Sequence, residues 1–326
     1  MERNDKQPKT LQEAVIFYAD PNNALAYMTL LRWPDGVVAC PTCGRNDVVF
    51  LHNQRKWQCK SVHPKRQFSA KVGTIFEDSP IALEKWIVVV WMLSNCRNGV
   101  SSYEIARTIG VTQKSAWFML HRIRLGLQDK QSGGKLGGGP HSKVEVDETW
   151  IGGKARNMHP ARRRRMAKYQ SKTAVMGMLE RGGKVKATVV GKRHGEQMQE
   201  IVRDNVIPGT WLMTDEFTGY KGLAKDYTHL VINHLESYVN GNVHTNGLEN
   251  FWSLLKRGLG GTYVAVEPFH LFRYVDEQAF RFNNRKDDDG QKLDDAARFN
   301  IAMSQVVGKR LTFAELTGKV GETTPF

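Results

Sequence analysis

Apolar residues in the second half of the chain come in short runs that alternate with segments of helical spacing. Strand-like runs are predicted at 144–151, 172–180, 184–190, 211–213 and 230–234. Helices are predicted at 196–206, between the last two strands, and from about residue 246 onward. The last of these helices is expected to bury one face, formed by Leu248, Phe251, Trp252 and Leu255.

This succession is three strands, then helix, strand, helix, strand and a final helix, which is the order of the ribonuclease H-like fold. In that fold the first and fourth strands are central neighbours. The first strand here carries Asp147 and the fourth delivers Asp215 at its end, so these carboxylates are expected to meet. The final helix would bring Glu249 beside them. The predicted catalytic fold is therefore a mixed sheet flanked by helices, within a multidomain α/β chain.

Three gathered carboxylates repel one another and are costly to bury without a counter-charge. Divalent metal removes that conflict, and hard oxygen ligands favour Mg²⁺ or Mn²⁺. Two such ions about 3.5 to 4 Å apart can activate the attacking oxygen and stabilise the leaving oxygen of a phosphodiester. The pattern predicts a phosphoryl-transfer site. A lone aspartate at a strand end is more often a turn or cap residue, so the prediction depends on the order of elements.

The stretch from Ser101 to Arg124 predicts a helix-turn-helix. Ser101 or Ser102 can cap a first helix, Gly110 can supply the positive φ of the turn, and Thr112 can cap a second helix. The second helix is expected to contact DNA bases or phosphates through Gln113, Lys114, Arg122 and Arg124. The alternative is an ordinary helical hairpin with a solvated basic face.

The spacing of the cysteines predicts a structural zinc site. Cys40 and Cys43 form one short knuckle, and Cys59 with His63 forms a second after a gap the length of a hairpin. Zinc takes four tetrahedral ligands of this kind, which two such knuckles can supply. His52 is an alternative fourth ligand. Three unlinked thiols and an exposed histidine are the alternative to a metal site.

The charge balance favours a polyanionic partner. The 326 residues include 47 Lys and Arg against 33 Asp and Glu, a formal net charge of +14, which suits double-stranded DNA. A solvated loop is the usual context of a basic run, but beside a DNA-cutting centre we expect phosphate contacts. The sharpest such run consists of Arg162, Arg163, Arg164 and Arg165.

A membrane surface would also suit a basic protein. However, no apolar run approaches the length of a bilayer span, the best being Trp86 to Leu93, which predicts a core helix. The first residues, MERNDKQPKT, are polar and contain no apolar signal core. We therefore expect a cytoplasmic, nucleoid-associated protein with no membrane partner.

Composition divides the chain into five expected segments. They are an N-terminal helix and zinc ribbon at 1–79, a helix-turn-helix region at 80–130, a glycine-rich linker at 131–142, an RNase H-like catalytic domain at 143–285, and a C-terminal helical tail at 286–326.

Four segments together resemble the ISXO2-like group of bacterial insertion-sequence transposases: VDETWIGG, KTAVMGMLERGG, TDEFTGY and HTNGLENFWSLLKRGLGGTYVAVEPFHLFRYVDEQAFRFNNR. Members of that group also begin with a zinc ribbon and a helix-turn-helix. The resemblance implies a DDE-type enzyme that cuts transposon ends and joins their 3′ hydroxyls to target DNA. It implies Asp147 and Asp215 as the first two metal ligands. Because two ends must be brought together, a dimer or higher oligomer on DNA is expected.

The third ligand has two candidates. The group often shows Asn where the final acid is expected, and here Asn246 and Glu249 lie one helical turn apart. We favour Glu249, because a carboxylate binds metal better and its spacing to Lys256 matches that of related transposases. Asn246 would then be an auxiliary ligand or hydrogen-bond donor. Lys256 and Arg257 are expected to hold the DNA end by its phosphates.

Two further functions compete with a transposase. One is a DNA-binding regulator that keeps the zinc ribbon and the helix-turn-helix but cuts nothing, against which the retained Asp147, Asp215 and Glu249 argue. The other is a nuclease of the same fold that hydrolyses DNA without joining it. An assay that separates joined product from cleaved product distinguishes all three.

Overall fold

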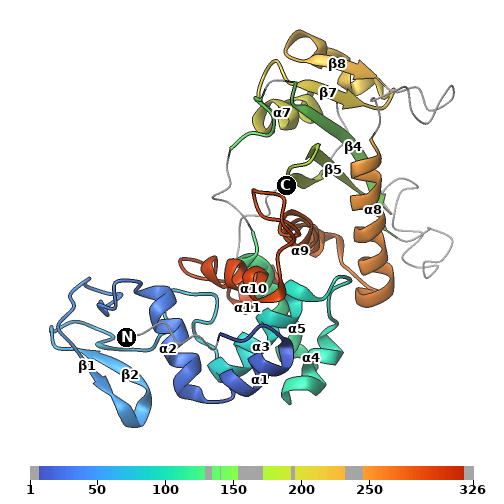
Figure 1. Cartoon of the computed structure of the whole chain (residues 1–326). Helices are drawn as coiled ribbons and strands as arrows, with labels where there is room; N and C mark the ends of the chain where they lie inside the picture. Colours follow the sequence, from blue (N-terminus) through green and yellow to red (C-terminus); the bar gives the residue numbers. More distant parts are fainter. Residues whose placement is uncertain are drawn as a thin grey trace. The chain divides into compact units, whose positions relative to one another are not determined.

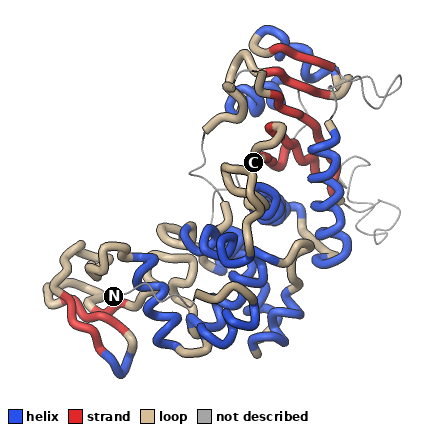
Figure 2. Tube along the Cα trace, in the orientation of Figure 1, coloured by secondary structure: helices blue, strands red, loops and turns tan. Residues whose placement is uncertain are grey.

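The structure is a computed structural model that describes residues 7–128, 134–139, 141–152, 172–191, 195–231 and 245–318. It divides into two compact units (Figures 1 and 2). The first combines Met1–Gln128 with Asn284–Glu322, and the second is built on Asp129–Asn283. The chain thus leaves the first unit, forms the second, and returns.

A five-stranded sheet forms the centre of the second unit. Its strands are β4 (Lys143–Ile151), β5 (Thr173–Glu180), β6 (Val185–Val190), β7 (Trp211–Thr214) and β8 (Thr228–Val231). They lie in the order β6-β5-β4-β7-β8. The first three pair antiparallel, whereas β7 joins β4, and β8 joins β7, in parallel. The first and fourth strands are central neighbours, so the predicted RNase H-like fold class is confirmed.

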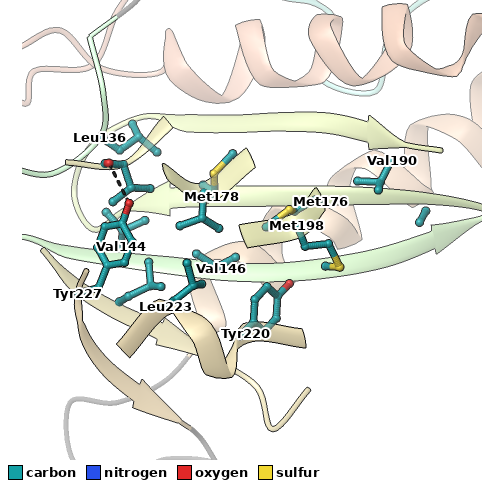
Figure 3. Packing of buried hydrophobic residues seen from close by; sticks show 14 residues of the cluster. Leu136, Val144, Val146, Met176, Met178, Val190, Met198, Tyr220, Leu223 and Tyr227 are labelled. Carbon is teal, nitrogen blue, oxygen red and sulfur yellow. Dashed lines mark hydrogen bonds between the residues drawn. The ribbon is translucent and has the colours of Figure 1, made fainter. Parts of the chain in front are cut away.

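Helices cover both faces of this sheet, and strand alternation decides which residues meet them. The helices are α7 (Gly195–Asn205), η3 (Thr218–Lys225), α8 (Asn246–Gly258), the π-helical turn η4 (Leu259–Tyr263), η5 (Pro268–His270) and α9 (Leu271–Asn283). On β5, Met176 and Met178 pack with residues of α7 and η3 (Figure 3), whereas Val175 and Leu179 pack with α8 and α9. Both faces are therefore buried.

The first unit is mainly helical. It contains α1 (Leu11–Tyr18), α2 (Pro21–Arg32), the ribbon strands β1 (Val48–Leu51), β2 (Lys56–Cys59) and β3 (Gln67–Phe68), a short turn η1 (His52–Gln54), α3 (Leu83–Asn95), α4 (Ser102–Ile109), α5 (Gln113–Gly126), α10 (Asp295–Ser304) and α11 (Phe313–Leu316). The apolar run at Trp86 to Leu93 is inside α3 and faces the core. Across the described helices, no apolar stretch is sufficient to traverse a lipid bilayer.

The predicted pair of helices from Ser101 to Arg124 is present as α4 and α5. The Ser101 side chain accepts from the Glu104 amide, Gly110 takes a φ of 63°, and the Thr112 side chain caps α5. The predicted caps at Ser101 and Thr112 and the predicted turn at Gly110 are therefore all present.

The C-terminal segment completes the core of the first unit. The ring of Phe299 on α10 lies 4.8 Å from that of Trp91 on α3, and the Tyr27 hydroxyl bonds Asn300 at 2.9 Å. The amide of Ile75 also donates to the carbonyl of Val306 at 3.0 Å. The helix expected in the C-terminal tail therefore packs among the N-terminal helices.

At Gly177, side chains of α8 pack directly against the backbone of β5. Gly177 is paired with Asp147 across β4 and β5. A Cβ built at Gly177 would lie 2.7 Å from Trp252 Cζ2 and 2.9 Å from Leu248 Cδ2, which is closer than carbon atoms can pack. Only glycine allows this helix to reach the strand that carries Asp147.

Replacing Gly177 by alanine is therefore expected to lower the free energy of unfolding by about 1–3 kcal/mol, because the methyl group forces Trp252 and Leu248 away from the sheet. Urea unfolding of the full chain measures the loss. Gly191→Ala is the matched control, since nothing lies within 4 Å of its Cβ position. An equal midpoint for the two variants would contradict the close approach of α8.

Candidate active site and zinc centre

Three carboxylates converge where the middle of β4 passes the C-terminal end of β7. The register of β4 against β7 places Glu145 beside Met213, so the next pair along the same face of β4 and past the end of β7 is Asp147 and Asp215. Asp147, Glu148 and Asp215 each offer an oxygen, and these oxygens lie within 4.8 Å of one another. The two aspartates lie together, as the order of elements predicts. Glu148 is a member that sequence reasoning did not assign.

Each of these carboxylates is oriented by a hydrogen bond from a different element. Trp252 Nε1 on α8 donates to Asp147 Oδ2 at 2.9 Å, and the Tyr220 hydroxyl on η3 donates to Glu148 Oε2 at 2.7 Å. The backbone amide of Phe217 donates to Asp215 Oδ1 at 3.1 Å. Such partners hold a ligating carboxylate in one orientation and are typical of metal sites.

The arrangement suits a hard divalent cation. Three carboxylates at this separation repel one another, and a cation between them converts that repulsion into attraction. Oxygen ligands of this kind are those that Mg²⁺ and Mn²⁺ prefer. All three acids are partly exposed, so the site is open to a substrate.

A fourth acid on the same strand has a structural role. Glu145 is 1% exposed and projects toward α8, on the same face of β4 as Asp147. Its Oε2 accepts from the backbone amide of Leu248 at 3.0 Å, in the first turn of α8, and its Oε1 pairs with Arg181 Nε at 2.9 Å. A carboxylate at this position stabilises the helix N-terminus. The signal was present in the sequence, since Glu145 precedes Asp147 by two residues in a buried strand.

The two candidates for the third ligand lie at the start of α8. Asn246 and Glu249 are exposed, and Glu249 is outside the group of carboxylates that lie within 4.8 Å of one another. Glu249 precedes Trp252, which reaches Asp147, by about one helical turn. Lys256 and Arg257, in the last turn of α8, are exposed. The assignment of the third ligand stays a prediction.

The four predicted zinc ligands come together in the first unit. Cys40, Cys43, Cys59 and His63 each offer an atom within 4.8 Å of the others. Tetrahedral zinc with Zn–S near 2.3 Å and Zn–N near 2.0 Å requires sulfurs about 3.8 Å apart and sulfur to nitrogen about 3.5 Å. The Cys43 and Cys59 sulfurs are 3.7 Å apart, and Cys40 Sγ lies 3.5 Å from His63 Nε2. The cluster fits zinc, and His63 rather than His52 belongs to it.

The environment of these groups favours the ligating forms. The hydrogen bond with the His63 ring lowers the pKa of the Cys59 thiol to about 6, which favours the thiolate that zinc binds. His63 Nδ1 lies 2.7 Å from the carbonyl oxygen of Pro64, to which it donates in the tautomer that offers Nε2 to a metal.

Two parts of the chain match known families of protein domains. Residues 135–283 match the family model of the ISXO2-like transposase domain, and residues 20–61 match that of the transposase zinc-ribbon domain. The chain thus carries an ISXO2-like transposase domain and a transposase zinc-ribbon domain. A relative described as an uncharacterized protein in transposable element ISH50 of Halobacterium salinarum is 27% identical over 260 residues, which are 74% of this chain and 84% of that protein.

In the helix pair of the first unit, α5 exposes only some of the residues that were predicted to contact DNA. Lys114 is exposed, with its ammonium 4.8 Å from the centre of the Phe313 ring, and Gln113 donates to Ser102 Oγ at 2.9 Å. Both lie at the N-terminal end of α5, as expected of a recognition helix. Arg162, Arg163, Arg164 and Arg165 lie outside the described residues.

Arg122 and Arg124 are corrections to the predicted DNA-contacting set, because they are buried at 3% and 1% exposure. Arg122 lies near the rings of Trp86 and Phe118 and donates to the Glu77 carbonyl. Burial lowers its pKa to about 10. Both arginines lie on the buried side of α5, at helical spacing from its buried apolar residues. They support the helix from inside rather than contacting phosphate.

Removal of zinc from the protein should unfold the ribbon strands β1–β3 while the sheet of the second unit stays folded, because metal binding supplies the folding free energy of so small a module. Cys40→Ser is expected to lose the single bound zinc, measured by elemental analysis, and hydrogen exchange locates the unfolding. Cys96→Ser is the control, since Cys96 is outside the cluster. Retention of one zinc per chain in Cys40→Ser would contradict the assignment.

Substitution of Glu145 tests its structural role. Glu145→Ala removes the carboxylate that pairs with Arg181 and accepts from the Leu248 amide, so the free energy of unfolding is expected to fall by about 3 kcal/mol. Glu145→Gln keeps an amide oxygen as acceptor, so its free energy of unfolding should fall less than that of Glu145→Ala. Urea unfolding compares them with Glu200→Ala, an exposed site on α7 expected to change stability by less than about 0.5 kcal/mol. Equal losses for Ala and Gln would exclude the capping interaction.

Proposed function

We propose that this protein cuts DNA at the ends of its insertion element and joins the freed 3′ hydroxyls to target DNA. The observation that carries the proposal is the convergence of Asp147 and Glu148, in the middle of β4, with Asp215, which follows the end of the adjacent strand β7. The match to the ISXO2-like transposase domain and the net charge of +14 support it.

Asp147 and Asp215 are proposed as metal ligands, with Glu249 as third ligand and Asn246 as an auxiliary group. Two bound Mg²⁺ or Mn²⁺ ions supply activation of the attacking oxygen and stabilisation of the leaving oxygen. The chain itself orients the ligands: Trp252 and Tyr220 donate to Asp147 and Glu148. Glu148 adds a further carboxylate to the same cluster.

Several cationic and polar side chains are proposed to hold DNA. Lys256 and Arg257 lie exposed at the end of α8, on the helix that donates to Asp147. Gln113 and Lys114 would read the element end. Proposed phosphate contacts outside the described residues are Arg162, Arg163, Arg164 and Arg165. One Zn²⁺ would stabilise the ribbon.

The assembly is proposed to be a dimer or higher oligomer on DNA. Two element ends must be cut and joined together, and one chain supplies one carboxylate cluster in its described residues. Transposition of this kind would take place on the nucleoid in the cytoplasm, where the DNA substrate is.

A strand-transfer assay with duplexes carrying the element's terminal sequence tests the proposal. Asp147→Ala and Asp215→Ala are expected to lower cleavage in Mg²⁺ by at least about a thousandfold, because the metal-held oxygens are lost. DNA affinity, measured by a mobility shift, should stay within about threefold, because neither residue contacts phosphate directly.

Glu216→Gln is the matched control, since it removes an exposed carboxylate next to Asp215 and should cleave as the unsubstituted protein does. In the same series, a loss for Glu249→Gln comparable to that of Asp147→Ala would support Glu249 as third ligand. Joined product supports transposition, cleaved product alone identifies a nuclease, and binding without either product identifies a regulator. Undiminished cleavage by Asp147→Ala would remove the proposed site.

A further inference from the structure

Trp150 stands apart from the other tryptophans of the chain. All eight lie in described residues, and Trp150 is the exposed one, at 42%, whereas the others are buried or partly buried. It is the penultimate residue of β4, the strand that carries Asp147 and Glu148. The strand therefore leads from the carboxylate cluster directly to an uncovered indole.

The pairing of β4 with β5 defines the face on which the indole lies. Glu148 is opposite Met176 and Trp150 is opposite Ala174, and both of these partners belong to the core cluster beneath α7. Side chains two residues apart on a strand share a face, about 7 Å apart. Trp150 is thus on the same face as Glu148, one step further along the strand.

Core packing does not account for Trp150. Its cross-strand neighbour Ala174 is 5% exposed and belongs to the core cluster, but Trp150 does not. A single exposed apolar side chain is ordinary on a protein surface. An exposed indole two residues from a carboxylate cluster is different, because it adds a flat aromatic face to a site for phosphodiester chemistry. Lys172, exposed beside Thr173, adds a cation at the same end of the strand pair.

We propose that Trp150 stacks on an unpaired nucleobase of the DNA strand whose phosphate lies at Asp147, Glu148 and Asp215. The inference rests on the proposed function. A nucleotide that leaves the base stack of a duplex exposes its π-face. Aromatic side chains bind such faces irrespective of base identity. Trp150 thus positions the strand at the carboxylates and makes no contact with the reacting atoms.

The test compares two substrates with the full-length protein in Mg²⁺. One is a duplex carrying the element's terminal sequence, and the other lacks the base of a single nucleotide on either side of the cleaved phosphate, taken in turn. Trp150→Ala and Trp150→Leu are expected to lower cleavage of the intact duplex by about tenfold to a hundredfold. Trp150→Phe keeps a ring and should stay within about fivefold.

On the duplex that lacks the stacked base, the unsubstituted protein and Trp150→Ala should cleave at equal rates, because the interaction is already absent. Trp211→Phe, a partly buried tryptophan at the start of β7, is the control and should behave as the unsubstituted protein on both substrates. Circular dichroism and the unfolding midpoint of each variant report whether it is folded, and Trp150→Leu separates stacking from apolar packing.

Two results would overturn the proposal: cleavage by Trp150→Ala at the unsubstituted rate, or the same fold-loss on the abasic duplex at both positions as on the intact one. Failure of the proposed function is distinguishable from these. In that case the unsubstituted protein cleaves neither substrate, and the stacking proposal fails with it, whereas failure of stacking alone leaves cleavage by the unsubstituted protein intact.

Discussion

The parallel pairing of β4 with β7 is the constraint on which the candidate active site depends. These two strands lie at the centre of the sheet and are covered on both faces, so their register is held by hydrogen bonds and by burial together. A slip of one residue would turn Asp147 toward the opposite face of the sheet and place Glu148 on the face that α8 covers. The convergence of Asp147 with Asp215 is therefore a consequence of core packing elsewhere on the same strands.

Each of the two hydrophobic cores of the second unit contributes one hydrogen-bond donor to the carboxylate cluster. Tyr220 belongs to the core beneath α7 and η3 (Figure 3), and its hydroxyl reaches Glu148. Trp252 belongs to the core under α8 and α9, and its indole nitrogen reaches Asp147. Aromatic residues with a polar end serve this purpose, because the ring is fixed by packing while the donor is directed at the site. The close approach at Gly177 and the cap at Glu145 hold α8 where Trp252 can donate.

The first unit uses a different means of stabilisation in each of its parts. The ribbon has a small aromatic cluster, in which the ring of Trp57 lies 5.5 Å from that of Trp33 and 6.0 Å from that of Phe68, beside the four side chains that fit zinc. The helix pair is supported by the returning C-terminal segment, because Lys309 Nζ donates to the carbonyls of Gly126 and Gln128, 2.7 Å from each, at the end of α5. The C-terminal end of α5, the helix expected to contact DNA, is thus capped by Lys309, which comes from a distant part of the sequence.

The sequence by itself determined the features that follow from local chemistry. Strand alternation around Asp147, the caps at Ser101 and Thr112, the turn at Gly110 and the order of strands and helices all depend on neighbours close in the chain. The cysteine spacing likewise indicates its knuckles without reference to the rest of the fold. These sufficed to predict the fold class, and they predicted that Asp147 and Asp215 would lie together.

Only the tertiary structure decided which charged side chains face water and which are enclosed. Arg122 and Arg124 carry the same charge as Lys114 and lie on the same helix, but helices packed against α5 bury them. Glu145 and Glu148 are close neighbours of Asp147 in sequence, yet one caps α8 and the other joins the carboxylate cluster. The packing of α10 against α3 could not be predicted from sequence patterns either. The physical reason is the same in each case, since burial and distance depend on elements that the chain supplies from far away.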